Sequence, residues 1–161
     1  MNKKIFPIIL ATIFFNLSGR SFADVSAKSD TGVLIIHHAD ELVYDGKKHT
    51  IECKGNVDIE NFPYHITAEI LFLTLNDEEN ELIKAIASKK VHISGNDIDA
   101  WGEKAIYIKG DDVLRIEGTN KNQARFNKGM NKLKGDIFIY SLKSKTIRST
   151  NINGILKKET K

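Results

Sequence analysis

The sequence predicts an all-β protein made of repeated antiparallel strands, and three observations lead to that fold class. Short segments in which apolar and polar residues alternate follow one another from Val33 onward. Clusters of Gly, Asn and Asp separate these segments, as expected of turns. A short phrase, in which an acid follows a small residue and precedes an aromatic one, returns along the chain. Several short strands at close spacing are typical of an all-β sandwich or barrel.

Seven segments have the alternation expected of strands that bury one face. They are VDIENF (57–62), HITAEILFL (65–73), VHISG (91–95), KAIYIKG (104–110), VLRIEG (113–118), DIFIYS (136–141) and TIRS (146–149). Turn signals lie at Asp45-Gly46, 61–63, Gly95-Asn96, Gly110-Asp111 and 143–145. Because successive side chains of a strand point to opposite faces, the sheet should have one apolar face.

The stretch NDEENELIKAIASKK (76–90) allows two interpretations. An Asn followed by acids and then by Leu82, Ile83 and Ile86 is typical of a capped amphipathic helix. Alternatively, residues 76–80 form a hairpin turn and the chain enters a strand at Glu81. The internal repeat favours the strand.

The returning phrase consists of a small residue, an acid, three further residues and an aromatic. It occurs at 39–44, 102–107 and 135–140, with a weaker copy that ends in Leu at 68–73. The four acids are Asp40, Glu69, Glu103 and Asp136, which are 29, 34 and 33 residues apart. Such self-similarity indicates stacked equivalent units, none of which buries its apolar face alone.

This phrase has a physical interpretation. The small residue marks a place where the strand bends or where its backbone approaches a neighbour, and the acid beside it points to the opposite, solvent-facing side of the pleat. The aromatic fills space that several units share. The second unit departs from the pattern, because Lys89-Lys90 stands where the aligned stretch, 34 residues earlier, has Gly55-Asn56.

The first 23 residues have the features of a secretory signal peptide. Two lysines precede an apolar run from Ile5 to Leu17, and Ser21-Phe22-Ala23 has the small-x-small pattern of a cleavage site. We therefore expect cleavage after Ala23 and export to the periplasm. The alternative is an uncleaved membrane anchor, although the run is short for a span of about 20 residues. The expected organisation is a signal peptide (1–23), a flexible lead-in (24–32), one β domain (33–153) and a charged tail (154–161).

Charge and cysteine content restrict the classes of function. The chain has 24 basic residues and 21 acidic ones, and removal of Lys3, Lys4 and Arg20 with the signal would leave 21 of each. This balance argues against a nucleic-acid binder, which needs a basic excess on one face. Cys53 is the one cysteine of the chain, so it forms no internal disulfide, and we expect it to be a small buried residue of a strand.

No pattern typical of an enzyme or of a metal site is present in the sequence. The five histidines lack the spacing of a zinc or helix-borne metal site, and the neighbours His37 and His38 would face opposite sides of a strand. The sequence has no nucleophile elbow and no glycine-rich phosphate loop. The recurring acids occupy equivalent positions of the repeat, which favours a structural role. We therefore expect a non-enzymatic protein without a cofactor or a metal.

Three stretches resemble one known family. HHADELVYDGKKHTIECKGNVDIENFPYHITAE (37–69), GEKAIYIKGDDVLRIEG (102–118) and KLKGDIFIYSLKSKTIRS (132–149) are similar to the OstA-like domain of the LptA family of periplasmic lipopolysaccharide-transport proteins. The resemblance implies an open β-jellyroll that accepts the acyl chains of lipid A. It also implies two partners, an LptC-like protein of the inner membrane and an LptD-like translocon of the outer membrane.

An apolar slot between sheet faces suits such a cargo, because each buried CH₂ of an acyl chain contributes about 0.8 kcal/mol. The strand alternation gives twelve expected lining residues, with Ile35 preferred to Ile36 in an apolar stretch that lacks clear alternation. They are Ile35, Val57, Ile59, Ile66, Ile70, Phe72, Val91, Ile93, Leu114, Ile116, Ile137 and Ile139.

The expected first and last strands, 32–38 and 146–152, lack the lysines and prolines that usually protect a sheet edge. We therefore expect head-to-tail strand addition between molecules, in a homo-oligomer or with a partner. Two alternatives to a lipid carrier stay open at this point. One is a membrane-anchored LptC-like adaptor of the same system, and the other is a structural β-repeat protein without lipid cargo.

Overall fold

A computed structural model describes residues 34–61, 63–78, 81–96 and 98–156 of the chain, which form a single sheet of twelve strands. The expected signal peptide, its cleavage site and residues 24–33 lie outside the described residues. The strands are β1 (Leu34–His38), β2 (Glu41–Asp45), β3 (Thr50–Asn61), β4 (Tyr64–Leu75), β5 (Leu82–Gly95), β6 (Ile98–Ile108), β7 (Val113–Glu117), β8 (Ala124–Lys128), β9 (Asn131–Gly135), β10 (Ile137–Ser141), β11 (Ile147–Thr150) and β12 (Asn153–Ile155).

These strands form two layers that share their longest members. The first half of β3 pairs with β2 and its second half pairs with β1, and β4, β5 and β6 continue both pairings. Further along, β7, β10 and β11 extend the layer that contains β2, while β8, β9 and β12 extend the layer that contains β1. The pairs β1–β2, β7–β8, β9–β10 and β11–β12 therefore each correspond to one long strand that is interrupted at the bend.

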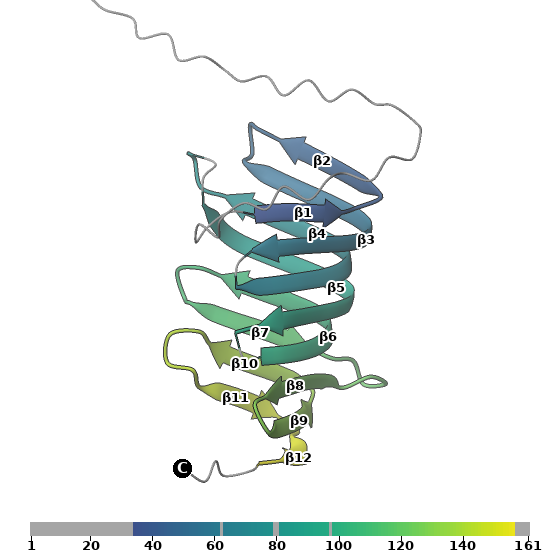
Figure 1. Cartoon of the computed structure of the whole chain (residues 1–161), viewed down its shortest axis with the longest axis vertical. Helices are drawn as coiled ribbons and strands as arrows, with labels where there is room; N and C mark the ends of the chain where they lie inside the picture. The colour runs from purple at the N-terminus through teal and green to yellow at the C-terminus, as the bar shows by residue number, and fades with distance from the viewer. Residues whose placement is uncertain (1–33, 62, 79–80, 97, 157–161) are drawn as a thin grey trace, which may run out of the picture.

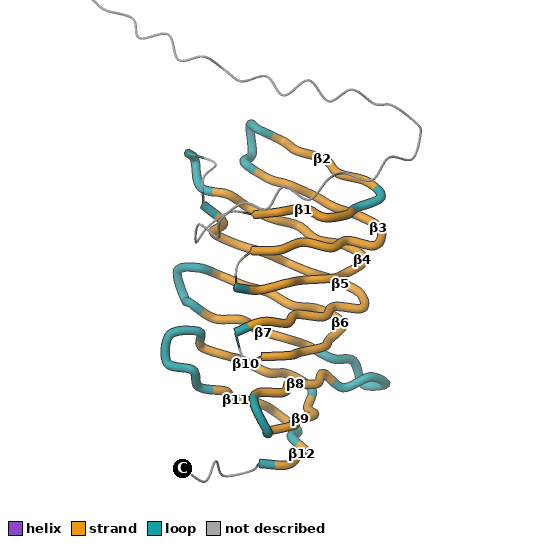
Figure 2. The backbone as a smooth tube through the Cα atoms, viewed as in Figure 1, coloured by secondary structure: helices purple, strands orange, loops and turns teal. Residues whose placement is uncertain are grey.

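The strands of both layers are stacked along the long axis of the molecule, with β1 and β2 at one end and β12 at the other (Figure 1). Long strands curve from one layer into the other along one side, and the hairpin turns lie along the opposite side (Figure 2). We call these the bent side and the open side. Every pairing is antiparallel, which confirms the all-β, repeated antiparallel fold expected from the sequence.

The recurring acids lie at the bends. Asp40 separates β1 from β2, Glu69 and Glu103 lie within β4 and β6, and Asp136 separates β9 from β10. Side chains of neighbouring bends, Asn56, Lys90 and Asn151, donate to three of these acids. Asn56 Nδ2 donates to Asp40 Oδ2 at 3.1 Å, Lys90 Nζ donates to Glu69 Oε1 at 2.7 Å, and Asn151 Nδ2 donates to Asp136 Oδ2. The returning phrase is therefore the sequence signal of alternate bends.

The small residue before the acid permits a close approach of two strands. A Cβ atom on Gly102 would lie 2.7 Å from the carbonyl oxygen of Glu117 and 2.7 Å from Cγ2 of Ile116. The fourth residue after the acid behaves differently from one repeat to the next. Leu73 and Tyr140 are fully buried, whereas Tyr44, in the end strand β2, is 49% exposed.

The segment with two interpretations is a strand, because residues 82–95 form β5 in the middle of the sheet. Packing between β4 and β6 on both edges overrides its local helical pattern. Three features were not predicted. Residues 41–45 form β2, residues 124–135 contain β8 and β9, and β12 extends to Ile155, beyond the expected start of the charged tail at 154.

The bend of β5 is made by two lysines in a strained conformation. Gly55 and Asn56 have φ angles of 72° and 46°, and Lys89 and Lys90 adopt the same left-handed region at 64° and 51°. In both bends the two left-handed residues oppose a single residue of the neighbouring strand, so each bend contains one extra residue. Gly and Asn tolerate this region, but for other residues it costs about 1–2 kcal/mol each. The second unit therefore differs from the repeat in the identity of these two residues but has the same backbone conformation.

Replacing both lysines with the residues of the equivalent bend, Lys89→Gly with Lys90→Asn, should stabilise the protein by about 1 kcal/mol, because strain at two positions is relieved. Asn at 90 can also bond Glu69 as Asn56 bonds Asp40. Urea unfolding measures the change. Lys84→Gly is the matched control, since Lys84 is an exposed strand residue without positive φ, and it should destabilise by about 0.5–1 kcal/mol. Equal destabilisation by both variants would contradict the strain.

Candidate functional site

The space between the two layers is lined by apolar side chains. Its buried residues come from β3 to β10 and include aliphatic residues in the middle of the stack and aromatic ones near β8 and β10. Among the described residues, no polar or charged side chain is fully buried in this core. Partly buried residues such as Leu34, Ile36 and Ile66 pack against it from the margins. The interior therefore offers dispersion and hydrophobic contacts rather than polar recognition.

Seven of the twelve expected lining residues face this interior. Val57, Ile59, Val91, Ile93, Leu114 and Ile116 are buried, and Ile66 packs against them. They lie where strand alternation is regular, so every second residue after a buried one is also directed inward.

The other five expected residues lie on the outer face, and the expectation was wrong for them. In β1, Ile36 packs on the core while Ile35 is 39% exposed. In β10, the inward residues are Phe138 and Tyr140, which leaves Ile137 and Ile139 outside. Both strands are apolar on both faces, so alternation alone did not mark the inner one.

Ile70 and Phe72 point outward for a different reason. The pairing of β4 shifts between Thr67 and Ile70, at the bend. This irregularity changes the phase of the alternation, so Leu71 and Leu73 become the buried residues that follow Ala68. A register change of one residue moves a strand's apolar set to the opposite face.

Sequence reasoning also missed part of the lining. In the middle of the stack, four small buried residues also line the interior: Ala85, Ala87, Ala100 and Ala105. Two further buried residues, Phe126 and Leu133, come from strands that were not predicted. The available signal was the regular spacing of the two alanines in KAIASKK (84–90), which alternate with Lys84, Ile86 and Ser88.

The two ends of the interior differ. At the β2 end, Leu42 and Tyr44 pair with the inward residues Cys53 and Ile51, yet each is 49% exposed. At the opposite end, Phe126 packs against Phe138 and Tyr140 with ring centroids 5.7 and 5.4 Å apart. An apolar face is thus open to solvent at the β2 end, and a buried aromatic cluster fills the other.

The same ends carry the edge strands of the sheet. Within the described residues, β1 and β2 each pair with β3 alone, β11 pairs with β10 alone, and β12 pairs with β9 alone. Each end therefore has two edges, one in each layer, where the sequence predicted a single strand. Unpaired backbone groups on such edges are able to pair with another chain.

Charged groups of the outer face form cross-strand pairs. His65 Nε2 lies 2.7 Å from Asp58 Oδ1, and His92 Nε2 lies 2.6 Å from Asp99 Oδ1. The His92 ring also stacks on Trp101, whose other neighbour, Arg125, lies 4.8 Å from the ring centroid. Partly exposed pairs contribute little stability. In the described part of the chain, no cluster of three metal-ligating side chains occurs, and no helix has the length and hydropathy for a membrane span.

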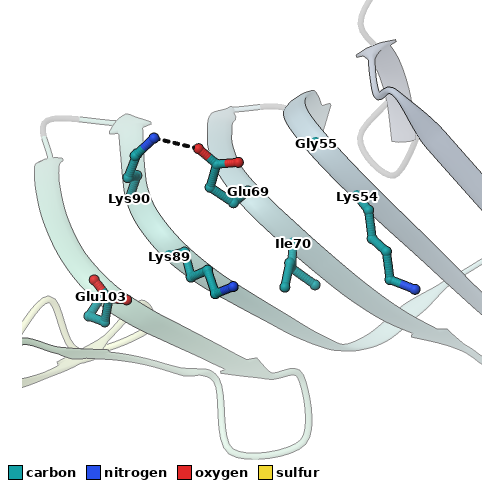
Figure 3. A pocket seen from close by; sticks show the side chains of 7 residues that line it. All are labelled: Lys54, Gly55, Glu69, Ile70, Lys89, Lys90 and Glu103. Atoms are coloured by element: carbon teal, nitrogen blue, oxygen red, sulfur yellow. Dashed lines mark hydrogen bonds and ion pairs between the residues drawn. The ribbon is translucent and has the colours of Figure 1, made fainter.

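A groove of about 610 Å³ follows the bent side on the outer surface (Figure 3). It is lined by Lys54, Gly55, Glu69, Ile70, Lys89, Lys90 and Glu103. Figure 3 shows Glu69 and Lys90 meeting across neighbouring strands, while Lys89 points away from that pair. Its charges are mixed, so this groove differs in chemistry from the apolar interior.

The chain is similar to known proteins in both sequence and fold. The family model described as "LptA/(LptD N-terminal domain) LPS transport protein" matches residues 38–146. The fold is similar to that of LptH from Pseudomonas aeruginosa, the LptA-homologous periplasmic component of its lipopolysaccharide transport device, with a TM-score of 0.67 and 12% sequence identity. That alignment covers 78% of this chain and 96% of the LptH chain. No curated protein sequence matches.

Cys53 reports on access to the interior, because it is a fully buried inward residue of β3. Burial, with the nearby Glu52 charge as a smaller cause, raises the pKa of its thiol. The thiolate is the reactive form, so alkylation by iodoacetamide should be slow at about pH 8 in the folded protein and should accelerate as pH rises or urea unfolds the chain. Cys53→Ala with Ser144→Cys, which carries an exposed thiol, is the control, and equal rates at about pH 8 would contradict a closed interior.

Proposed function

Because the chain belongs to the family of LptA and LptD N-terminal lipopolysaccharide-transport proteins, we propose that it is a periplasmic carrier that shields the acyl chains of lipid A between its two layers. The role is that of a non-enzymatic bridge component in transport from the inner to the outer membrane. The observation that carries this proposal is the apolar interior, bounded on one side by continuous bent strands and on the other by separate hairpin turns.

The chemistry of the interior suits acyl chains. Each CH₂ group moved from water into an apolar environment contributes about 0.8 kcal/mol, and no polar partner is required for this gain. The described interior is filled by its own side chains, many of them fully buried. Entry of a chain therefore requires the layers to separate.

Separation is easiest along the open side. On the bent side, β3, β4, β5 and β6 run without interruption from one layer to the other, so the covalent backbone joins the layers there. On the open side, side-chain packing holds them together. The exposed inward residues Leu42 and Tyr44 make the β2 end the suitable entrance, because their apolar surface is already in contact with solvent.

The edge strands suit an end-to-end assembly. Strands β11 and β12 of one molecule would pair with β2 and β1 of the next, which would continue both layers and the interior between them. The same geometry would serve an LptC-like partner at one end and an LptD-like translocon at the other. Such a heterologous contact does not close on itself, so it produces filaments of variable length.

Photo-crosslinking tests the lipid path. A photoreactive side chain at Ile36 or Ile93, both inward, should capture lipopolysaccharide added to the purified protein. The neighbours Ile35 and His92 point outward and are the matched controls. Mass spectrometry of the adducts identifies the lipid. Equal capture at all four positions would exclude an interior path, and lipid extraction from unmodified protein provides an independent measurement of the cargo.

Proline substitution in β2 tests the assembly. Adjacent residues of an edge strand direct their N–H groups alternately to the neighbouring strand and to the free edge. Of Leu42→Pro and Val43→Pro, one therefore removes a bond to β3 and the other removes a free donor. The variant that keeps its thermal stability should show smaller species than the unmodified chain in sedimentation velocity at high concentration. An unmodified chain that stays monomeric at every concentration would contradict strand addition.

A further inference from the structure

The inner faces of the strands carry one charged side chain within the described residues, that of Lys128. It ends β8, where it alternates inward with Ala124 and Phe126, both fully buried. The other acids and bases of the described strands occupy outward positions or bends, as the registers place them. A charge on an otherwise apolar surface is costly without compensation, so its position calls for a functional explanation.

Lys128 spans the open side. It belongs to the β8 layer, and its Nζ donates to Oη of Tyr140 in β10 of the other layer at 3.3 Å. A second bond runs to the carbonyl oxygen of Lys145, in the turn between β10 and β11, at 3.2 Å. Nζ also lies 5.0 Å from the centroid of the Tyr140 ring, within the range of a cation–π contact.

These contacts leave the ammonium without a counter-ion. An ammonium has three N–H donors, and both acceptors that Lys128 reaches are neutral. No carboxylate of the described residues lies within 4.0 Å of its nitrogen. The positive charge and one donor are therefore available at the boundary between the apolar interior and solvent.

We propose that Lys128 binds the phosphate of a lipid headgroup at the open side while the acyl chains of the same molecule lie between the layers. This inference rests on the proposed function of the interior. The polar end of an amphiphile must stay at the boundary with water when its chains are buried, and Lys128 presents its cation at that boundary. Bonds between an ammonium and a phosphate are charge-assisted and stronger than neutral ones. The Tyr140 hydroxyl is itself fully buried, and by accepting from Lys128 it helps to hold the ammonium in place.

The test compares two lipids that share their acyl chains. One is lipid A with both phosphates, and the other is the same lipid A after removal of both phosphates, each presented in identical detergent micelles. Affinities come from competition with fluorescently labelled lipopolysaccharide. Lys128→Met keeps the apolar stem and removes the charge. It should weaken binding of the phosphorylated lipid about tenfold, as expected for a lost charge-assisted bond, and leave binding of the dephosphorylated lipid unchanged.

Two further variants separate charge from structure. Lys128→Arg keeps the charge and should retain the preference for the phosphorylated lipid. Lys132→Met removes an exposed, outward-facing lysine of the adjacent strand β9 and should change neither affinity. An equal loss for both lipids in Lys128→Met would mean that Lys128 acts as a structural clasp between the layers, and no loss would mean that it contacts no ligand. Either result overturns the proposal.

The unmodified protein provides the remaining comparisons. It should prefer the phosphorylated lipid, and raised salt should reduce that preference. Equal, tight binding of both lipids would overturn the role of Lys128 and leave the carrier function intact, whereas binding of neither lipid would overturn both. Inorganic phosphate should compete weakly, since it lacks acyl chains. Saturation by inorganic phosphate in the concentration range of lipid A would show a site for free phosphate and exclude the headgroup.

Discussion

The bend in the long strands is the constraint on which the rest of the molecule depends. Because β3 to β6 pass through both layers, the covalent backbone fixes one margin of the interior and leaves the other to side-chain packing. Left-handed residues on one strand and an acid on the next make each bend possible, as in the pairs Asn56 with Asp40 and Lys90 with Glu69. The same feature recurs along the chain, and the acids therefore recur at similar intervals.

This constraint separates polar from apolar chemistry. Outward positions carry the histidine–carboxylate pairs and most charges, and inward positions carry aliphatic and aromatic residues. A stack of bent strands has two ends and one open side, and in this protein the residues at these three places differ in chemical properties. The β2 end exposes apolar residues, the β10 end contains the aromatic cluster, and Lys128 stands at the open side near that cluster. A transport protein that handles an amphiphile requires such a division.

Much of the fold could be predicted from the sequence. Alternation identified the antiparallel strands, and the period of the acids indicated stacked equivalent units and favoured the strand at 82–95. Seven lining residues followed from regular alternation around residues such as Ile59 and Ile93. The expected buried state of Cys53 was confirmed. These features depend on local pattern. Because the side chains of a strand alternate between its two faces with a period of two, a strand with one buried face shows alternating apolar and polar residues in the sequence.

Tertiary structure decided what local pattern leaves open. At the bend of β4 the two successive residues Glu69 and Ile70 both lie outside the buried core, so the alternation changes phase and Leu71 is buried while Ile70 is not. Residues 124–135 have little apolar alternation of their own. They form β8 and β9 because β8 pairs with β6 and β9 pairs with β8, which extends one layer. Whether an inward lysine meets a carboxylate depends on strands distant in sequence, and Lys128 meets a tyrosine and a carbonyl oxygen instead. The sequence by itself determined the strands and their repetition, and the packing of the two layers determined which faces became the interior.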